Sequence, residues 1–190
     1  TGGGSNVTIY TGSGDDTAMV GSGQLGSITG TLTVDGAGGS GDAVFLNDQS
    51  SAAGQTFTVN GSSVTRAGLN VTAVAEDLTI LAGNYGDTLN VLATASAVKF
   101  NAGGGSDTVN LGNVAGTGMD GIRHNVTIQG EGGFDAVNWL DQQSTARHSL
   151  GVAASNVKRT VNGIDAGTIT QNSVESVKLY AGSGQDTLDY

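Results

Sequence analysis

The sequence predicts an all-β protein folded as a right-handed parallel β-helix (β-solenoid) of about six to eight coils. Three observations lead to this prediction. Short runs in which apolar and polar residues alternate recur along the chain, and a period of two is typical of strands. Each run ends in a glycine-rich corner followed by an aspartate, and this pattern occurs six times. The 190 residues include no proline, so every backbone N–H remains available to a neighbouring strand.

The six corners give the predicted coils their spacing. Their aspartates are Asp16, Asp42, Asp87, Asp107, Asp135 and Asp186. Successive aspartates are 26, 45, 20, 28 and 51 residues apart, and the spacings of 20 to 28 residues fit one turn of a three-sided coil. Inward-facing residues of successive turns should stack along one axis. We expect one such column to contain Val7, Leu32, Leu78, Val98, Val126 and Val177.

Two further segments between the corners carry hairpin signals. Residues 56–66 alternate on both sides of Asn60-Gly61, and an Asn-Gly pair between alternating runs favours a tight hairpin. Residues 149–159 repeat this segment in the second half of the chain. The sequence therefore predicts β-hairpins near 56–66 and 149–159 that protrude from the coil.

The chain contains an internal duplication. DAVFLNDQSS (42–51) recurs as DAVNWLDQQS (135–144), and EDLTILAGNYGDT (76–88) recurs as ESVKLYAGSGQDT (175–187). We expect one elongated repeat domain over 1–190, with duplicated units at approximately 6–96 and 97–190. Arg66 and Arg159 occupy equivalent positions in the two units, and we expect them to pair with Glu76 and Glu175, respectively.

Composition excludes several functions. The formal charge of −10 disfavours binding to nucleic acid and to anionic membranes. There is no cysteine for disulfides or thiol catalysis, and no apolar run long enough for membrane insertion. No catalytic motif is present, and His124 and His148 do not occupy equivalent positions, so we expect both on the surface and no enzymatic activity.

The corner sequences GSGDDT, GGGSDTV and GSGQDTL resemble the glycine- and aspartate-rich repeats of the RTX (haemolysin-type) calcium-binding proteins. The resemblance implies Ca²⁺ held between stacked corners by carboxylates and backbone carbonyls, which suit a hard cation. The residues implied are the six corner aspartates and Gly12, Gly14, Gly83, Gly103, Gly105, Gly182 and Gly184. The alternative is that each aspartate accepts N–H groups of its own corner and no cation is bound.

The whole unit, hairpin included, is also similar to repeats of very large secreted or surface proteins of bacteria, which implies an extracellular or cell-surface location. We therefore expect a non-enzymatic structural segment of a stalk, sheath, fibre or surface protein. It would associate end to end or with flanking repeats, because unpaired strand edges need a partner. The alternative is a calcium-dependent adhesion module that contacts glycans or a cell surface; a polysaccharide-active β-helix enzyme is a third interpretation.

Overall fold

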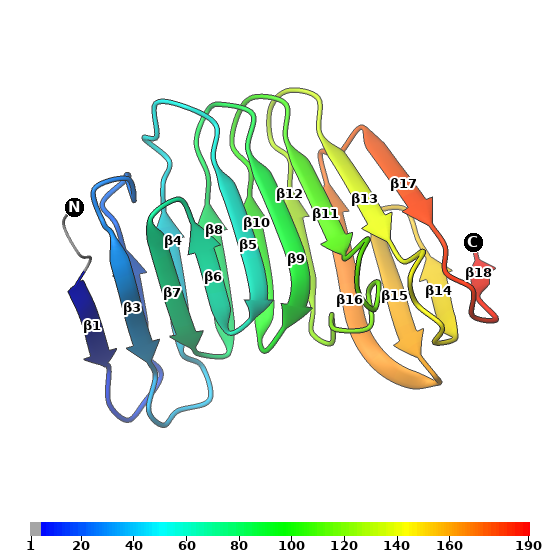
Figure 1. Cartoon of the computed structure of the whole chain (residues 1–190), viewed down its shortest axis with the longest axis horizontal. Helices are drawn as coiled ribbons and strands as arrows, with labels where there is room; N and C mark the ends of the chain where they lie inside the picture. Colours follow the sequence, from blue (N-terminus) through cyan, green and yellow to red (C-terminus); the bar gives the residue numbers. More distant parts are fainter. Residues whose placement is uncertain (1–4) are drawn as a thin grey trace.

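The protein is an all-β structure built from two sheets. In the computed structural model, which describes residues 5–190, eighteen strands form two nine-stranded sheets (Figure 1). These residues contain no helix that could cross a membrane. The predicted all-β class is confirmed. The three-sided coil is wrong, because the strands lie in two sheets.

The first sheet, sheet A, has the spatial order β1-β3-β7-β6-β5-β9-β11-β13-β17. Its strands are β1 (Ser5–Tyr10), β3 (Gly30–Asp35), β5 (Thr56–Gly61), β6 (Ser63–Arg66), β7 (Leu69–Val74), β9 (Thr88–Thr94), β11 (Thr108–Gly112), β13 (Ala136–Leu140) and β17 (Ser176–Tyr180). All neighbours in this sheet are parallel except those of β6, which is antiparallel to both β5 and β7.

The second sheet, sheet B, has the spatial order β18-β14-β15-β16-β12-β10-β8-β4-β2. Its strands are β2 (Thr17–Val20), β4 (Ala43–Asn47), β8 (Asp77–Leu81), β10 (Ala97–Asn101), β12 (Val126–Gln129), β14 (His148–Val152), β15 (Asn156–Val161), β16 (Ile164–Asn172) and β18 (Thr187–Asp189). Here the antiparallel member is β15, between β14 and β16.

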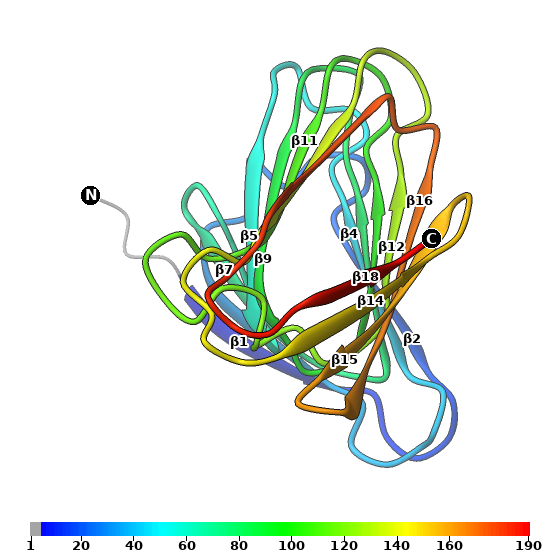
Figure 2. The same cartoon turned by 90° about the vertical axis from the view of Figure 1, so that its right-hand side faces the viewer.

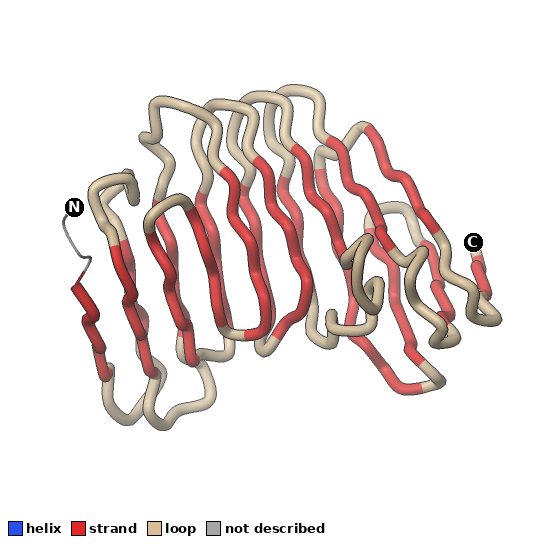
Figure 3. The backbone as a smooth tube through the Cα atoms, viewed as in Figure 1, coloured by secondary structure: helices blue, strands red, loops and turns tan. Residues whose placement is uncertain are grey.

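The chain passes alternately from one sheet to the other. It enters sheet A at β1, sheet B at β2, sheet A at β3 and sheet B at β4, and it continues in this way to β18. Figure 2, which looks along the long axis, shows the two sheets facing each other. The glycine-rich corners are loops along the two edges where the chain changes sheet (Figure 3).

The core lies between the sheets. Val98 of β10 is in register with Leu78 of β8 and with Val126 of β12, and all three side chains are buried. Phe100, two residues after Val98 on β10, is also buried, whereas Lys99, between Val98 and Phe100, is exposed. This alternation is the one that the sequence shows. Burying each such apolar side chain stabilises the fold by roughly 1.5–3 kcal/mol.

The two predicted hairpins form, but they do not protrude. Asn60 pairs with Ser63 across the first turn, and β5, β6 and β7 all lie in sheet A. The second hairpin, β14–β15, lies with β16 in sheet B. Each hairpin is continued by a third strand, so the group of three occupies one place in the sheet and leaves parallel edges on both sides. Protrusion would instead have left the antiparallel strand without a second neighbour.

Strands that are equivalent by the sequence repeat lie in opposite sheets. In the first unit the chain enters a sheet seven times, alternating between sheets A and B. We call each such passage a visit; the seven visits are β1, β2, β3, β4, the β5–β7 group, β8 and β9. Since seven is odd, β10, the equivalent of β1, falls in sheet B. The second unit is therefore turned by half a revolution about the long axis relative to the first.

The predicted single column is wrong, because the six positions lie on strands of both sheets. Val7 is in register with Leu32 in sheet A, whereas Leu78, Val98 and Val126 are in register in sheet B. Val177 lies in sheet A, next to Val137. The six positions thus form separate columns in two sheets.

Candidate functional site

The six corner aspartates lie along two edges of the molecule. The visits to sheet A are parallel to one another, so the chain always leaves that sheet at the same edge, which we call the A-to-B edge. Asp16, Asp42 and Asp186 lie there, each just before a strand of sheet B. Asp87, Asp107 and Asp135 lie along the opposite, B-to-A edge, each just before a strand of sheet A.

Along the B-to-A edge the carboxylates form a ladder between neighbouring corners. The Asp87 N–H donates to Asp107 Oδ1 at 2.6 Å, and the Asp107 N–H donates to Asp135 Oδ1 at 2.9 Å. The ladder continues at both ends: Gln55 N–H donates to Asp87 Oδ1 at 2.6 Å, and Asp135 N–H donates to Glu175 Oε2 at 2.8 Å. Each carboxylate therefore accepts a hydrogen bond from the backbone of the preceding corner.

The A-to-B edge has the same arrangement in the first unit. Asp16 N–H donates to Asp42 Oδ1 and Asp42 N–H donates to Glu76 Oε2, both at 2.8 Å. Near the other end, His148 N–H donates to Asp186 Oδ1 at 3.0 Å. Glu76 and Glu175 thus terminate equivalent ladders, and neither pairs with Arg66 or Arg159 as the sequence had suggested.

The carboxylates of the longer ladder are buried and close to one another. Asp87 and Asp107 are each 2% exposed, and Asp135 is 3% exposed. Burial, together with the charges of Asp135 and Asp87, raises the pKa of Asp107 to about 7, although the hydrogen bond from Asp87 N–H lowers it. Burial likewise raises the pKa of Asp87. The Oδ2 atoms of Asp107 and Asp135 are buried without a hydrogen-bond partner, so they lack a proton donor or a cation.

The corner glycines allow neighbouring corners to approach closely. Gly12, Gly14, Gly103 and Gly105 have positive φ angles between 85° and 120°. A Cβ atom at Gly103 would lie 2.1 Å from Gly83 O, and one at Gly184 would lie 2.0 Å from Ala146 O. A Cβ atom at Gly182 would lie 2.5 Å from Ser144 O.

Carbonyl oxygens of these corners bind the neighbouring corner. Gly104 N–H donates to Gly83 O at 3.0 Å, and Gly132 N–H donates to Gly103 O at 2.9 Å. Gly83 N–H donates to Asp87 Oδ2 within its own corner at 3.1 Å. Hydrogen bonds within a corner and between corners therefore both occur.

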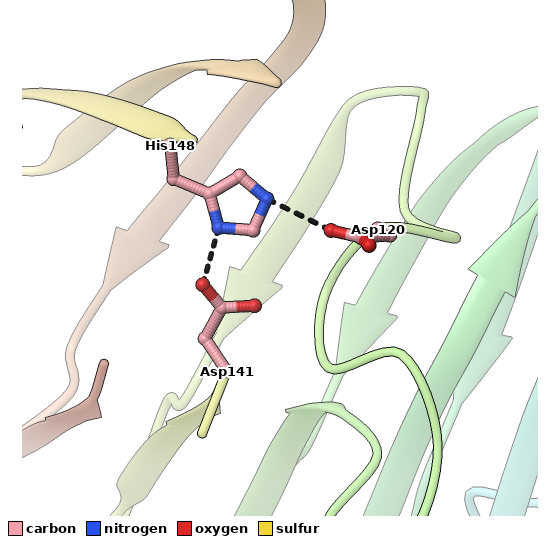
Figure 4. A group of neighbouring side chains, drawn as sticks. All are labelled: Asp120, Asp141 and His148. Atoms are coloured by element: carbon pink, nitrogen blue, oxygen red, sulfur yellow. Dashed lines mark hydrogen bonds and ion pairs between the residues drawn. The ribbon is translucent and has the colours of Figure 1, made fainter. Parts of the chain in front are cut away.

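A second acidic group lies where the chain leaves sheet A near β13 and β14, and it contains Asp120, Asp141 and His148 (Figure 4). One potential ligand atom from each residue lies within 4.8 Å of the others, and among residues 5–190 this is the group of three whose spacing suits a metal ion. None of the six corner aspartates belongs to it. His148 is 2% exposed, so the prediction of a surface position is wrong for His148. His124 is exposed, as predicted.

Both ring nitrogens of His148 face carboxylates. Nδ1 contacts Asp141 Oδ2, and Nε2 lies 3.0 Å from Asp120 Oδ1. Burial lowers the pKa of His148, but the hydrogen bond and charge of Asp141, with the charge of Asp120, outweigh burial, and the pKa is raised above 6.5. Only the imidazolium form can donate from both nitrogens. Met119 N–H donates to Asp141 Oδ1 at 2.9 Å. Ser144 Oγ donates to Asp120 Oδ1, also at 2.9 Å.

Arg159 is buried beside this cluster. It is 1% exposed and donates to Met119 O and Ile122 O, each at 3.2 Å. Burial lowers the pKa of Arg159 to about 10, while the charges of Asp141 and Asp120 oppose that shift. With His148 protonated, two positive and two negative side chains balance, so the cluster is a self-neutralised ionic network. With His148 neutral, its imidazole and the two carboxylates are a ligand set that suits a divalent transition metal.

The equivalent place in the first unit holds a simpler pair. Arg66 Nε donates to Asp48 Oδ2 at 2.9 Å, and Leu25 N–H donates to Asp48 Oδ1 at 2.7 Å. Asp48 and Asp141 are equivalent by the repeat, so Asp48 could have been found from sequence as a partner for Arg66. Asp120 is equivalent to Gly26 and His148 to Gln55. No sequence signal therefore pointed to the cluster.

Comparison with protein families, with curated proteins and with solved structures finds no match for this chain.

Proposed function

We propose that the protein is a structural repeat segment whose two sheets are the faces of a right-handed, two-sided parallel β-helix, and that such segments associate end to end in an extracellular stalk, sheath or fibre. The observation that carries the proposal is the exposure of apolar strands at both ends. On β1, Val7 is 49% and Ile9 is 42% exposed. On β17, Val177 is 53% and Leu179 is 42% exposed.

These side chains have the same orientation as the buried core. Val7 is in register with Leu32, and Leu179 with Trp139, and Leu32 and Trp139 are buried. Within residues 5–190, β1 and β17 each pair with one neighbouring strand and have no strand on the other side. Open strand edges with apolar side chains favour pairing with another strand.

The repetition of the corner ladder also supports a structural role. Asp16–Asp42–Glu76 and Asp107–Asp135–Glu175 are the same hydrogen-bonded arrangement, built once in each unit. A catalytic site requires one set of groups around one substrate, whereas a scaffold gains from every repeated contact.

Sedimentation velocity over a range of concentrations tests this function. We expect species that lengthen as concentration rises, and rods in electron micrographs whose width matches one molecule. A single monomeric species at every concentration would contradict end-to-end association.

A divalent cation such as Ca²⁺ at the corner ladder is a second proposal, supported by the unpartnered Oδ2 atoms of Asp107 and Asp135. A bound cation would neutralise these buried carboxylates and use oxygens that make no hydrogen bond. We expect Ca²⁺ to raise the melting temperature at pH 8 and EDTA to reverse the effect. In Asp107→Asn the rise should be lost. Melting that is indifferent to both additions would remove the cation from the proposal.

A further inference from the structure

The molecule contains a junction between its own two units. At this junction β8 pairs with β10 in sheet B, with Leu78 opposite Val98, and β9 pairs with β11 in sheet A, with Leu89 opposite Val109. The four side chains are buried. The first unit ends and the second begins at these pairs.

The two free ends of the molecule are the separated halves of a junction of the same kind. By the sequence repeat, β17 and β18 are equivalent to β8 and β9, and β1 and β2 are equivalent to β10 and β11. The strands flanking them also correspond, since β8 lies next to β4 and β17 lies next to β13, the equivalent of β4. Thus one end presents the first half of the junction and the other end presents the second half.

The apolar surfaces of the two ends fit this relation. An apolar hollow of about 280 Å³ opens at the β17–β18 end, where Trp139, Leu150, Val177, Leu179 and Leu188 contribute to its wall. At the internal junction the corresponding space is closed by Val98 and Phe100 of β10, which are 2% and 0% exposed. Their equivalents at the opposite end of the molecule are Val7 and Ile9, which are half exposed.

The polar groups correspond as well. At the internal junction Asp87 N–H donates to Asp107 Oδ1 at 2.6 Å, and Thr108 N–H donates to Asp87 O at 2.9 Å. The equivalents at the free ends are Asp186 and Asp16, and Asp16 Oδ2 is buried without a hydrogen-bond partner. A Cβ atom at Gly105 would lie 2.6 Å from the Tyr85 carbonyl carbon of the preceding corner, whereas its equivalent, Gly14, has nothing within 4 Å.

Resting on the proposed end-to-end function, we propose that a second copy of this chain docks head to tail in the register of the internal junction. Val177 lies opposite Val7 of the next copy, Leu188 lies opposite its Ala18, and the Asp186 N–H donates to its Asp16 carboxylate. Sheet A then continues into sheet A and sheet B into sheet B. Because the joint uses two different surfaces, it leaves both surfaces free at the ends of every oligomer and generates an open filament.

Cysteine cross-linking tests the register, since the chain has no cysteine of its own. Thr79 of β8 and Lys99 of β10 are in register and alternate with the core residues; Thr79 is 8% exposed and Lys99 is exposed, and their equivalents are the exposed Lys178 and Thr8. Neighbouring strands are about 4.8 Å apart, within the reach of a disulfide. A mixture of Thr8→Cys and Lys178→Cys should give a cross-linked dimer under mild oxidation, and neither variant alone should do so. Thr8→Cys mixed with Ser176→Cys, two residues out of register, should cross-link far more slowly.

Substitution at the exposed end strand provides a second test that does not depend on oxidation. Val7→Lys places a charge in the joint and should weaken association at least about tenfold. Thr8→Lys on the same strand points outward, where its equivalent is the native Lys99, and should leave association unchanged. Circular dichroism should show both variants folded, because Val7 is half exposed in the single molecule.

The outcomes separate the joint from the proposed function. Association with cross-links at another register, or between two copies of one variant, would overturn the joint while leaving end-to-end assembly intact. Absence of any association by sedimentation would overturn both.

Discussion

Asp107 is 2% exposed and lies between the carboxylates of Asp87 and Asp135. Two unit charges 4 Å apart repel by about 1 kcal/mol in water and by about 4 kcal/mol at an effective dielectric constant of 20. The raised pKa of Asp107 results from burial and, after it, from this repulsion. The ladder therefore holds its shape most easily when one carboxyl is protonated or a cation lies beside it.

Stability in EDTA should depend on pH through Asp107. Its pKa in the folded state is about 7, above the ordinary value of 3.8. The folded state binds this proton more tightly, so the contribution is fully present below pH 3.8 and is lost as pH rises through about 7, by on the order of a few kcal/mol. Asp107→Asn keeps an oxygen for the Asp87 N–H and has no charge. Thermal unfolding from pH 4 to 8 should show the variant more stable than the parent at pH 8.

The control for this measurement is Asp165→Asn. Asp165 is exposed, and its pair with Lys158 at 3.6 Å lies in solvent. Its pH profile should follow that of the parent. A flat parent profile between pH 4 and 8 would contradict the assignment to Asp107.

His148 adds a second dependence of the same sign. Its pKa in the folded state is raised above 6.5, so its contribution is present below pH 6.5 and is lost as pH rises through the folded value. His148→Gln can still donate one hydrogen bond but cannot carry the charge. NMR titration of the imidazole should give a pKa above 6.5 in the parent. The unfolding profile of the variant should keep the part of the slope that comes from Asp107 and lose the part that comes from His148, so it should be less steep than that of the parent; an imidazole that titrates below 6.5 would contradict the network.

At the scale of elements, each three-stranded group is held to the corner beside it by a buried arginine. Arg66 ends β6 and pairs with Asp48, which follows β4, and their side chains are 7% and 1% exposed. Removing one partner of a buried pair leaves an uncompensated charge, which costs about 3–5 kcal/mol. This pair therefore ties the position of the β5–β7 group to that of the corner.

Arg66→Gln should lower the free energy of unfolding by about 3–5 kcal/mol, measured by chemical denaturation. The matched variant Lys158→Gln removes an ion pair whose side chains are 67% and 63% exposed, and it should change stability by less than about 1 kcal/mol. Equal effects of the two substitutions would show that burial of the Arg66–Asp48 pair contributes nothing.

Sequence patterns predicted the elements better than their arrangement. Alternation around Leu78, Val98 and Val126 located three strands of one column, and Asn60-Gly61 located a hairpin turn. The assignment of strands to sheets could not be predicted, because it depends on whether the chain of one unit passes through the two sheets an odd or an even number of times. Likewise the corner aspartates were predicted as a set, but their role as acceptors for the N–H groups of the preceding corner depends on which corners are neighbours. Asp120 is replaced by Gly26 in the first unit, so repetition gave no indication of its role.

At the scale of the whole molecule, stability should decline from the centre toward both ends. Strands β8, β9, β10 and β11 each have a neighbour on both sides, whereas β1, β2, β17 and β18 have one. In a linear array each strand is stabilised mainly by its nearest neighbours, so opening begins where one neighbour is missing.

Hydrogen exchange checks this gradient. In dilute protein, amides of β1, β17 and β18 should exchange at least about tenfold faster than those of β8–β11. In concentrated protein the end strands should become protected while the central strands do not change. Uniform protection along the chain would show that the ends are not the weak points.

The odd number of sheet visits in each unit has a geometric consequence for any array of such units. An outward-facing side chain of one unit and its equivalent in the next unit lie on opposite sheets, so they point to opposite sides of the long axis. A label or an engineered loop placed once per unit would therefore lie alternately on opposite sides of the array, and on either side it would recur at every second unit.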